Sequence, residues 1–492
     1  MVRKDFSRAE ESLDPEDWGA MRALGRQMVD DMMTYLEQVR ERPVWEAIPE
    51  EVKAKLREPL PLEPQDPETV YEKFLQDVLP YPMGCIHPRF WGWALGTGTP
   101  LDMLAEMLAA GMNSNTGGGE HVANYVEAQV LNWLKEMLGY PAEASGLLVS
   151  GGSMANLVGL AVARNAMAGF DVRRQGVSAS PKGMTVYAST ETHSSVQKAV
   201  ELLGMGADSL HLIPVNSDFQ IELSALEAAI SEDRDSGHHP ICVVGNAGTI
   251  NTGAFDPLSS LADICQGERM WFHVDGAFGA LAALSPEVRL IVAGMDRADS
   301  VAFDMHKWMY MPYEIGCALV RKEEEHRRSF SLTPTYLTHT ERGLAAGEAW
   351  FSDYGVQLSR NFRALKGWMS IQARGVSKYG RLIQQNVDQA RYLAALVEAS
   401  PDLELMAPVP LNIVCFRFCA PHRDDASLNK LNQELVLRLH EGGIALCSYV
   451  TIGDKYGLRV GIFNHRSRRD DFDVFVGEVI GLGKSLLDEG FA

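Results

Sequence analysis

Short apolar, β-branched segments alternate with helix-like segments between residues 146 and 320, and this alternation restricts the fold more than any other feature of the sequence. Strand-like segments are expected at 146–149, 184–188, 211–215, 241–245, 270–274, 300–303 and 316–320. Helix-like segments lie between them at 153–168, 194–203, 223–230 and 258–265. Such alternation is typical of a mostly parallel sheet with helices on both faces. We therefore expect an α/β protein built on a mostly parallel seven-stranded sheet.

The flanking sequence predicts two further parts. Residues 17–39 have the periodicity of an amphipathic helix, and residues 43–67 are rich in proline and acidic residues, which favours an extended connector. A long helix is expected at 360–374. Beyond it, strands at 413–418, 445–452 and 457–463, a helix at 427–441 and a closing helix from Asp470 predict a smaller α+β domain. The expected division is an N-terminal helical arm (1–80), a large domain (81–374) and a small domain (375–492). The arm has little core of its own, so we expect it to pack against something else, such as a second subunit.

Composition excludes several classes of function. The chain has 492 residues, of which 46% are hydrophobic and 22% charged, as in ordinary globular proteins. Its net charge of -20 argues against a nucleic-acid or anionic-membrane partner. It shows neither the apolar core of a signal peptide nor the ~20 apolar residues of a membrane span, so a cytoplasmic location is expected. Seven cysteines without a CxxC pair favour reduced thiols over disulfides or a metal site.

The segment from residue 298 to residue 308 carries the clearest chemical signal. It places Lys307 directly after a strand-like segment and beside His306. Asp275 ends an earlier strand-like segment. A lysine that forms an imine and a carboxylate that keeps a pyridine nitrogen protonated are the two groups that pyridoxal phosphate requires. Taken alone, Lys307 could be a solvated surface charge and Asp275 a helix N-cap.

Other residues have both a functional and a structural interpretation. The turn Ser150-Gly151-Gly152-Ser153 follows a strand and opens a helix, so it could bind an anion or be a plain strand-to-helix turn. His193 could stack on an aromatic ring or be a structural histidine, and His306 could donate to a phosphate. Arg459 lies within an apolar segment and needs a partner, either an anion in the site or a structural carboxylate.

Five motifs together closely resemble the pyridoxal-phosphate-dependent group II amino-acid decarboxylases, which include aromatic-amino-acid, glutamate and histidine decarboxylases. They are His87-Pro88-Arg89-Phe90, Ser150-Gly151-Gly152-Ser153, Thr192-His193-Ser194-Ser195, His273-Val274-Asp275-Gly276-Ala277 and Asp304-Met305-His306-Lys307-Trp308. The resemblance extends from about Pro82 to Phe463. It implies the aspartate-aminotransferase-like fold (fold type I), pyridoxal 5'-phosphate as cofactor, and a homodimer with active sites at the subunit interface.

The resemblance also implies roles for the motif residues. Lys307 would carry the cofactor as an aldimine, Asp275 would bind the pyridine nitrogen and His193 would stack on the ring. The phosphate would be held by Gly152, Ser153 and the backbone of Met154, with help from His306.

Two positions depart from the family pattern. Thr249 matches a Gly-Thr-Thr segment that contacts the cofactor, but Ile250 replaces the second threonine. Many relatives have asparagine where this chain has Asp304. An acid beside a phosphate is costly, so we expect the Asp304 side chain to face elsewhere.

The implied reaction is decarboxylation of an L-amino acid to the amine and CO2. Residues 333–339 resemble the family's mobile catalytic loop, in which Tyr336 would protonate the substrate carbon in the partner subunit's site. Related aldehyde synthases have phenylalanine at this place, so Tyr336 favours simple decarboxylation. An aldehyde synthase, another lyase or a transaminase on the same fold, and an inactive relative that only assembles with a partner, remain alternatives.

Two cues on the substrate disagree. Asn113 and Asn115 resemble an Asn-x-Asn pattern of glutamate-type enzymes, and a polar wall suits a polar or acidic side chain. Residues 354–362 resemble the aromatic branch, in which a serine such as Ser359 is associated with phenolic substrates. Thr97 is a further candidate for contacting the substrate. A polar or acidic L-amino acid is our first expectation and a tyrosine-like one the second.

Overall fold

A seven-stranded sheet forms the centre of the computed structural model, which describes residues 11–180, 182–332 and 340–491. The strand order is β2-β8-β7-β6-β5-β3-β4. The strands are β2 (Ser145–Val149), β3 (Met184–Ser189), β4 (Leu210–Ile213), β5 (His239–Asn246), β6 (Trp271–Asp275), β7 (Ser300–Asp304) and β8 (Gly316–Val320). Neighbouring strands from β7 to β4 are parallel, whereas β8 is antiparallel to both of its neighbours. The predicted mostly parallel sheet is confirmed.

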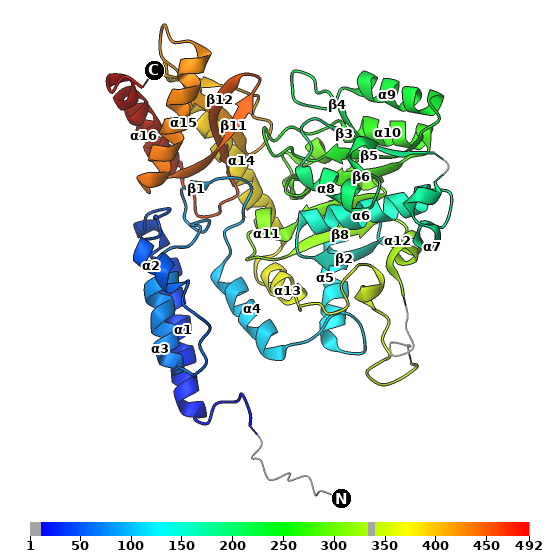
Figure 1. Ribbon diagram of the computed structural model, residues 1–492, viewed down its shortest axis with the longest axis horizontal. Helices are drawn as coiled ribbons and strands as arrows, with labels where there is room; N and C mark the ends of the chain where they lie inside the picture. The colour runs from blue at the N-terminus through cyan, green and yellow to red at the C-terminus, as the bar shows by residue number, and fades with distance from the viewer. Residues whose placement is uncertain (1–10, 181, 333–339, 492) are drawn as a thin grey trace, which may run out of the picture.

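Helices cover both faces of this sheet (Figure 1). Alternate side chains of a strand point to opposite faces, and on β6 the neighbours His273 and Phe272 show this. A Cβ on Gly159 of α6 would lie 2.6 Å from the His273 ring, so α6 packs on that face. Leu261 of α10 and Phe272 both lie within 3.1 Å of a Cβ placed on Gly245, so α10 packs on the other. The surrounding helices are α5 (Val122–Leu138), α6 (Gly152–Met167), α7 (Val172–Gln175), α8 (Ser194–Leu202), α9 (Leu223–Asp235), α10 (Leu258–Glu268), α12 (Glu323–Phe330) and α13 (Ala364–Arg374).

The second sheet has five strands in the order β1-β11-β12-β10-β9. They are β1 (Phe90–Trp91), β9 (Leu403–Leu405), β10 (Ile413–Phe418), β11 (Leu446–Ile452) and β12 (Lys455–Gly461). Its C-terminal strands are antiparallel and carry α14 (Val376–Glu398), α15 (Asp425–Glu441) and α16 (Arg469–Asp488). Only β1, parallel to β11, comes from the N-terminal side of the large sheet. The chain therefore enters this sheet before it builds the larger one.

The N-terminal arm contains α1 (Trp18–Glu37), α2 (Glu50–Lys55) and α3 (Pro67–Lys73), and it projects below the small sheet in Figure 1. The hydroxyl of Tyr71 on α3 donates to Asp31 on α1 over 2.8 Å. The arm is tied to the C-terminal part by an ion pair of 2.6 Å between Arg40 and Asp471. The predicted extended connector at 43–67 is interrupted by a short helix, because α2 lies within it.

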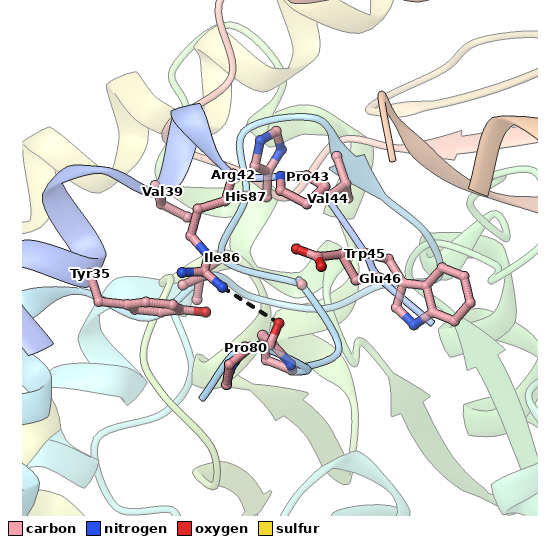
Figure 2. Close-up of a pocket in the computed structure, with 12 residues that line it drawn as sticks. Tyr35, Val39, Arg42, Pro43, Val44, Trp45, Glu46, Pro80, Ile86 and His87 are labelled. Carbon is pink, nitrogen blue, oxygen red and sulfur yellow. Dashed lines mark hydrogen bonds between the residues drawn. The ribbon is translucent and has the colours of Figure 1, made fainter. Parts of the chain in front are cut away.

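Where the arm meets the rest of the chain, the side chains enclose a small hollow. Figure 2 shows Arg42 beside the Tyr35 ring, 4.8 Å from its centroid, and reaching the carbonyl oxygen of Pro80. The hollow has a volume of about 20 Å³, which is room for one water molecule. It is therefore a packing feature of the arm. Among the described residues, none of the helices is long and apolar enough to cross a membrane.

Candidate active site

A cavity of about 480 Å³ opens at the carboxyl ends of the parallel strands, where ligands bind in open α/β sheets. Its walls come from the turn after β2, the segment after β3, the loop after β5 and the ends of β6 and β7. Lys307, Asp275, His193 and Thr249 all line it, together with the Ser150–Met154 turn. The fold thus brings together groups that are far apart in the sequence.

Lys307 lies in α11 (Met305–Trp308), one short turn beyond the end of β7. Its ammonium nitrogen is 2.8 Å from Oδ2 of Asp304, whose side chain is only 1% exposed. The other carboxylate oxygen of Asp304, Oδ1, is buried without a hydrogen-bond partner among the described residues. The expectation that Asp304 faces away from the site is wrong, because Asp304 lines the cavity and pairs with Lys307.

The glycine turn before α6 has no room for side chains. A Cβ on Gly152 would lie 2.9 Å from Oδ2 of Asp304, and one on Gly151 would lie 3.2 Å from the His306 ring. The first N–H groups of a helix lack partners within it, which is why such a turn binds anions. In α6 the N–H of Met154 already donates to the Gly151 carbonyl over 2.9 Å. The backbone donors left for an anion are therefore those of Gly152 and Ser153, rather than that of Met154.

His306 connects this turn to the lysine. Its Nδ1 accepts the backbone N–H of Ile315 over 3.2 Å, and its Nε2 is 3.6 Å from Oδ2 of Asp304. Burial lowers the pKa of His306, so the neutral ring carries its proton on Nε2. The His306 ring also contacts Tyr313, at 4.6 Å between centroids. The donor end of His306 thus faces the carboxylate beneath the glycine turn.

Asp275 and His193 are held by residues that the sequence did not single out. Oδ2 of Asp275 accepts from Nδ2 of Asn156 over 2.8 Å, and its Oδ1 accepts the N–H of Ala277 over 3.1 Å. Nδ1 of His193 accepts from Ser195, whose hydroxyl is 2.8 Å away. Burial lowers the pKa of His193. Ser195 ends the Thr192–Ser195 motif and Asn156 lies three residues beyond the Ser150–Ser153 motif, but the sequence alone assigned a role to neither.

The loop after β5 forms another wall of the cavity. Thr249 and Ile250 line it, and Oγ1 of Thr249 accepts the N–H of Ala254 over 3.1 Å. Arg459 lies behind this wall, where its guanidinium donates to the carbonyl oxygens of Ile250 (2.5 Å) and Trp93 (2.8 Å). The interpretation with a structural carboxylate is wrong, because the partners of Arg459 among the described residues are backbone carbonyls and the Ser448 hydroxyl. Its Nη2 has no partner among those residues, and the interpretation with an anion stays a prediction.

None of the four predicted substrate residues lines the cavity of its own chain. Oδ1 of Asn115 accepts the backbone N–H groups of Gly117 and Arg360, so that oxygen is committed to the loop. Asn113 ends α4 (Pro100–Met112) in a left-handed conformation with φ 45°, Ser359 is exposed and Thr97 is buried elsewhere. In the family that the chain resembles, the matching stretch lines the partner subunit's site, so the role of Asn113 and Asn115 toward a substrate stays a prediction.

Aromatic side chains are present in this cavity. Trp93, Phe278 and Tyr313 line the cavity, and Trp93 and Tyr313 are each about half exposed. Tyr336, the predicted proton donor, lies outside the described residues.

Comparison with known proteins identifies one family. The model of the pyridoxal-dependent decarboxylase conserved domain matches residues 49–419. An aromatic-L-amino-acid decarboxylase of Bacillus atrophaeus is 35% identical over 458 residues, covering 92% of this chain and 93% of that protein. Histidine decarboxylase of Homo sapiens is 30% identical over 479 residues, covering 93% of this chain and 69% of that protein.

Solved structures agree in fold. The chain is similar to Oryza sativa TDC with PLP and tryptamine, with a TM-score of 0.89 and 26% identity over 96% of this chain and 100% of that one. It is also similar to mouse CSAD, with a TM-score of 0.87 and 26% identity over 95% of this chain and 99% of that one.

Proposed function

The chain belongs to the pyridoxal-dependent decarboxylases, and from this membership we propose that it converts an aromatic L-amino acid into the corresponding amine and CO2. Pyridoxal-phosphate-dependent decarboxylation of an amino acid follows from the family itself, and the aromatic side chain is the proposed part. The observation that carries it is the aromatic lining of the cavity by Trp93, Phe278 and Tyr313. Support also comes from the relative that is 35% identical, which is named for aromatic L-amino acids. This proposal replaces the polar or acidic preference, because the relatives reported above are named for aromatic L-amino acids and for histidine.

The residues of the cavity fit pyridoxal phosphate. The Gly151-Gly152 turn offers free N–H groups and no room for a side chain, which suits a phosphate. Lys307 supplies an amine and Asp275 a buried carboxylate in the same cavity. When bound, the cofactor supplies a reactive carbonyl carbon and a ring that accepts the electron pair left by departing CO2.

We assign the following tasks to the cavity residues. Asp275 would accept a hydrogen bond from the ring nitrogen of the cofactor and stabilise its positive charge, because Asp275 is a carboxylate fixed on both oxygens. His193 has its Nδ1 engaged by Ser195, so its Nε2–H is the end that would face ring or substrate. Lys307 must lose a proton before it can act as a nucleophile, and Asp304 at 2.8 Å is the group that holds that proton in place.

We propose a homodimer as the active form. Residues 113–117 and 358–361 are joined by a backbone hydrogen bond from Thr116 to Arg360 and by the Asn115 side chain, and they lie outside the cavity of their own chain. Nearby helices expose several large apolar side chains, as expected of a surface that a second copy covers. These side chains are Met107, Leu108, Met112, Val122 and Tyr125. In such a dimer, Asn113 and Ser359 would approach the partner's cavity, and Tyr336 would act there as proton donor.

The experiment is a panel of the twenty amino acids incubated with the cofactor-loaded protein, with CO2 and products followed by mass spectrometry. Amine and CO2 from phenylalanine, tyrosine, tryptophan or histidine would support the proposal. Turnover of glutamate or aspartate alone would reject the aromatic assignment and restore the polar one. Aldehyde with hydrogen peroxide in place of amine would leave the family intact and reject simple decarboxylation.

A further inference from the structure

We propose that Asn156 is the positioning residue on which both Asp275 and His193 depend, so that one buried amide sets the acceptor at the cofactor ring nitrogen and the donor above the ring. This inference rests on the proposed function of the same cavity. Asn156 lies in the first turns of α6, is 1% exposed and uses both ends of its amide. Its Nδ2 donates to Oδ2 of Asp275 over 2.8 Å and to Oγ of Ser195 over 3.0 Å. Its Oδ1 is 2.9 Å from Nε2 of His273.

The orientation of that amide is fixed from behind by groups whose polarity is known. Nε1–H of Trp271 can only donate, and its acceptor is Oγ of Ser300 at 2.8 Å. The hydroxyl proton of Ser300 is then free to donate to Nδ1 of His273, at 2.7 Å. Burial lowers the pKa of His273 to about 4, so the ring is neutral near pH 7 and carries its one proton on Nε2. His273 therefore donates to Oδ1 of Asn156, which places the Nδ2 group toward Asp275.

The chain of donors divides at Asn156 into two branches that both end in the cavity. One Nδ2 hydrogen goes to Asp275, which as a carboxylate only accepts. The other goes to Ser195, whose own proton is then directed to Nδ1 of His193 at 2.8 Å. The backbone N–H of Ser195 also points to that nitrogen, at 3.2 Å. His193 is thus held as the tautomer with its proton on Nε2.

The network makes the two site residues sensitive to the same substitution. Without the Asn156 amide, Asp275 loses a buried donor and Ser195 loses the bond that directs its proton. His273 is left with an unpaired N–H in a site that water does not reach. Substituting Ser195 breaks only the branch to His193 and leaves the bond between Asn156 and Asp275 in place. Comparing the Asn156 and Ser195 variants therefore distinguishes the loss of the hydrogen bonds made by Asn156 from general damage to the core.

The test compares Asn156→Leu, Ser195→Ala and Asn432→Leu with the wild-type enzyme. Three quantities are measured: the dissociation constant of pyridoxal phosphate, the visible absorbance band of the bound cofactor, and the steady-state constants with the best substrate of the panel. Asn432 on α15 is the matched control, since it is a fully buried asparagine outside the cavity lining, with two hydrogen bonds to Phe418 of β10 and one to Leu428.

Asn156→Leu is expected to weaken cofactor binding by about tenfold or more and to shift the absorbance band, because Asp275 no longer holds the ring nitrogen as before. Ser195→Ala should leave the affinity and the band within about twofold of wild type while lowering kcat by about tenfold, in the range of a general acid-base contribution. Asn432→Leu should lower thermal stability and change none of the three readouts.

Wild-type affinity and an unshifted band in Asn156→Leu would overturn the inference. If Asn156→Leu does not fold, Ser195→Ala becomes the test. An unchanged kcat in Ser195→Ala would then overturn the inference that Asn156 positions His193 through Ser195. A wild-type chain that binds no cofactor is a separate outcome, because it rejects the proposed function itself before any variant is compared.

Discussion

Asp304 is a buried carboxylate in the cavity, although the sequence predicted that its side chain would face elsewhere. The substitution Asp304→Asn tests what this charge does. The carboxylate lies between Lys307 and the glycine turn, with Oδ1 lacking a partner among the described residues. Asparagine has nearly the same shape, removes the negative charge and adds an N–H donor. We expect the variant to bind pyridoxal phosphate more tightly than wild type, and to bind pyridoxal, which lacks the phosphate, about equally well.

The expected magnitude follows from the geometry. An Asp304 oxygen is 2.9 Å from where a Cβ on Gly152 would stand, so an anion bound by the Gly152 N–H lies within about two hydrogen-bond lengths of the carboxylate. At about 6 Å and an effective dielectric constant near 20, each pair of unit charges repels by about 2–3 kcal/mol. The Lys307 ammonium offsets part of this repulsion. A gain of roughly tenfold in affinity is therefore the expected lower bound, since about 1.4 kcal/mol corresponds to a factor of ten.

The assay is a fluorescence or absorbance titration of the apo protein with each of the two ligands. Asp299→Asn is a matched control, because Asp299 precedes the same strand, accepts the N–H of Phe272 and does not line the cavity. Equal changes for pyridoxal phosphate and pyridoxal would refute the reasoning, since the charge would then not act on the phosphate. Weaker binding of pyridoxal phosphate by the variant would show that the loss of the ion pair with Lys307 outweighs the relief of repulsion between Asp304 and the phosphate.

Three further outcomes are expected. Tyr336→Phe should lose amine and gain aldehyde and peroxide, followed by oxygen consumption and mass spectrometry; unchanged amine output would remove Tyr336 from the mechanism. Arg360→Met should lower the free energy of unfolding by about 3–5 kcal/mol, because it leaves Glu127, at 2.5 Å and fully buried, without its cation, whereas adding Glu127→Leu should recover much of that loss in urea unfolding. Burial lowers the pKa of His273 to about 4 and of His326 to about 3, against about 6.5 unfolded, so the unfolded chain binds more protons below pH 6.5. Stability should therefore fall by up to about 3 kcal/mol per pH unit between pH 6 and 5, and a urea midpoint that stays constant there would contradict this sign.

The seven strands of the large sheet could be predicted because each contains a short run of apolar or β-branched residues between turn signals. Strands β6 and β7 are buried at every residue, so burial and sequence pattern coincide. The short helix α2 was missed for the opposite reason. Its Glu50 and Glu51 stand in the first turn and Lys53 and Lys55 in the last, an arrangement that complements the helix dipole. Six residues carry too little periodicity to indicate a helix, and the proline and acidic residues of 43–67 favoured an extended connector instead.

The strand β1 shows a second limit. Its two residues, Phe90 and Trp91, pair with Leu446 and Cys447, more than three hundred residues away in the sequence. No local pattern distinguishes two residues in a sheet from two residues in a loop, since the pairing partner alone defines them. The predicted domains are continuous stretches of the chain, so they place β1 in the large domain (81–374), although β1 joins the small sheet.

The residues of the site also differ in whether local sequence is enough to predict their role. Lys307, Asp275 and the glycine turn directly follow strands, and in a parallel sheet the ends of those strands meet at one edge, so chain order alone brings them together. Asn113 and Asn115 show the limit of local information, because an exposed amide in a motif can serve the backbone as well as a ligand, and Oδ1 of Asn115 accepts the N–H of Arg360. A functional amide is distinguished from a structural one only by its partners.

Asn156 is the complementary case. It lies just beyond the glycine turn, and its partners Ser195 and Asp275 belong to two different motifs, yet its role follows from neither motif separately. The donor-only indole of Trp271 and the acceptor-only carboxylate of Asp275 fix the direction of every proton between them. An asparagine is suited to that junction because its planar amide offers two donors and an acceptor, whereas aspartate would set two carboxylates 2.8 Å apart. Chemistry at this cavity therefore depends on a polar chain that passes through the core between α6 and the sheet.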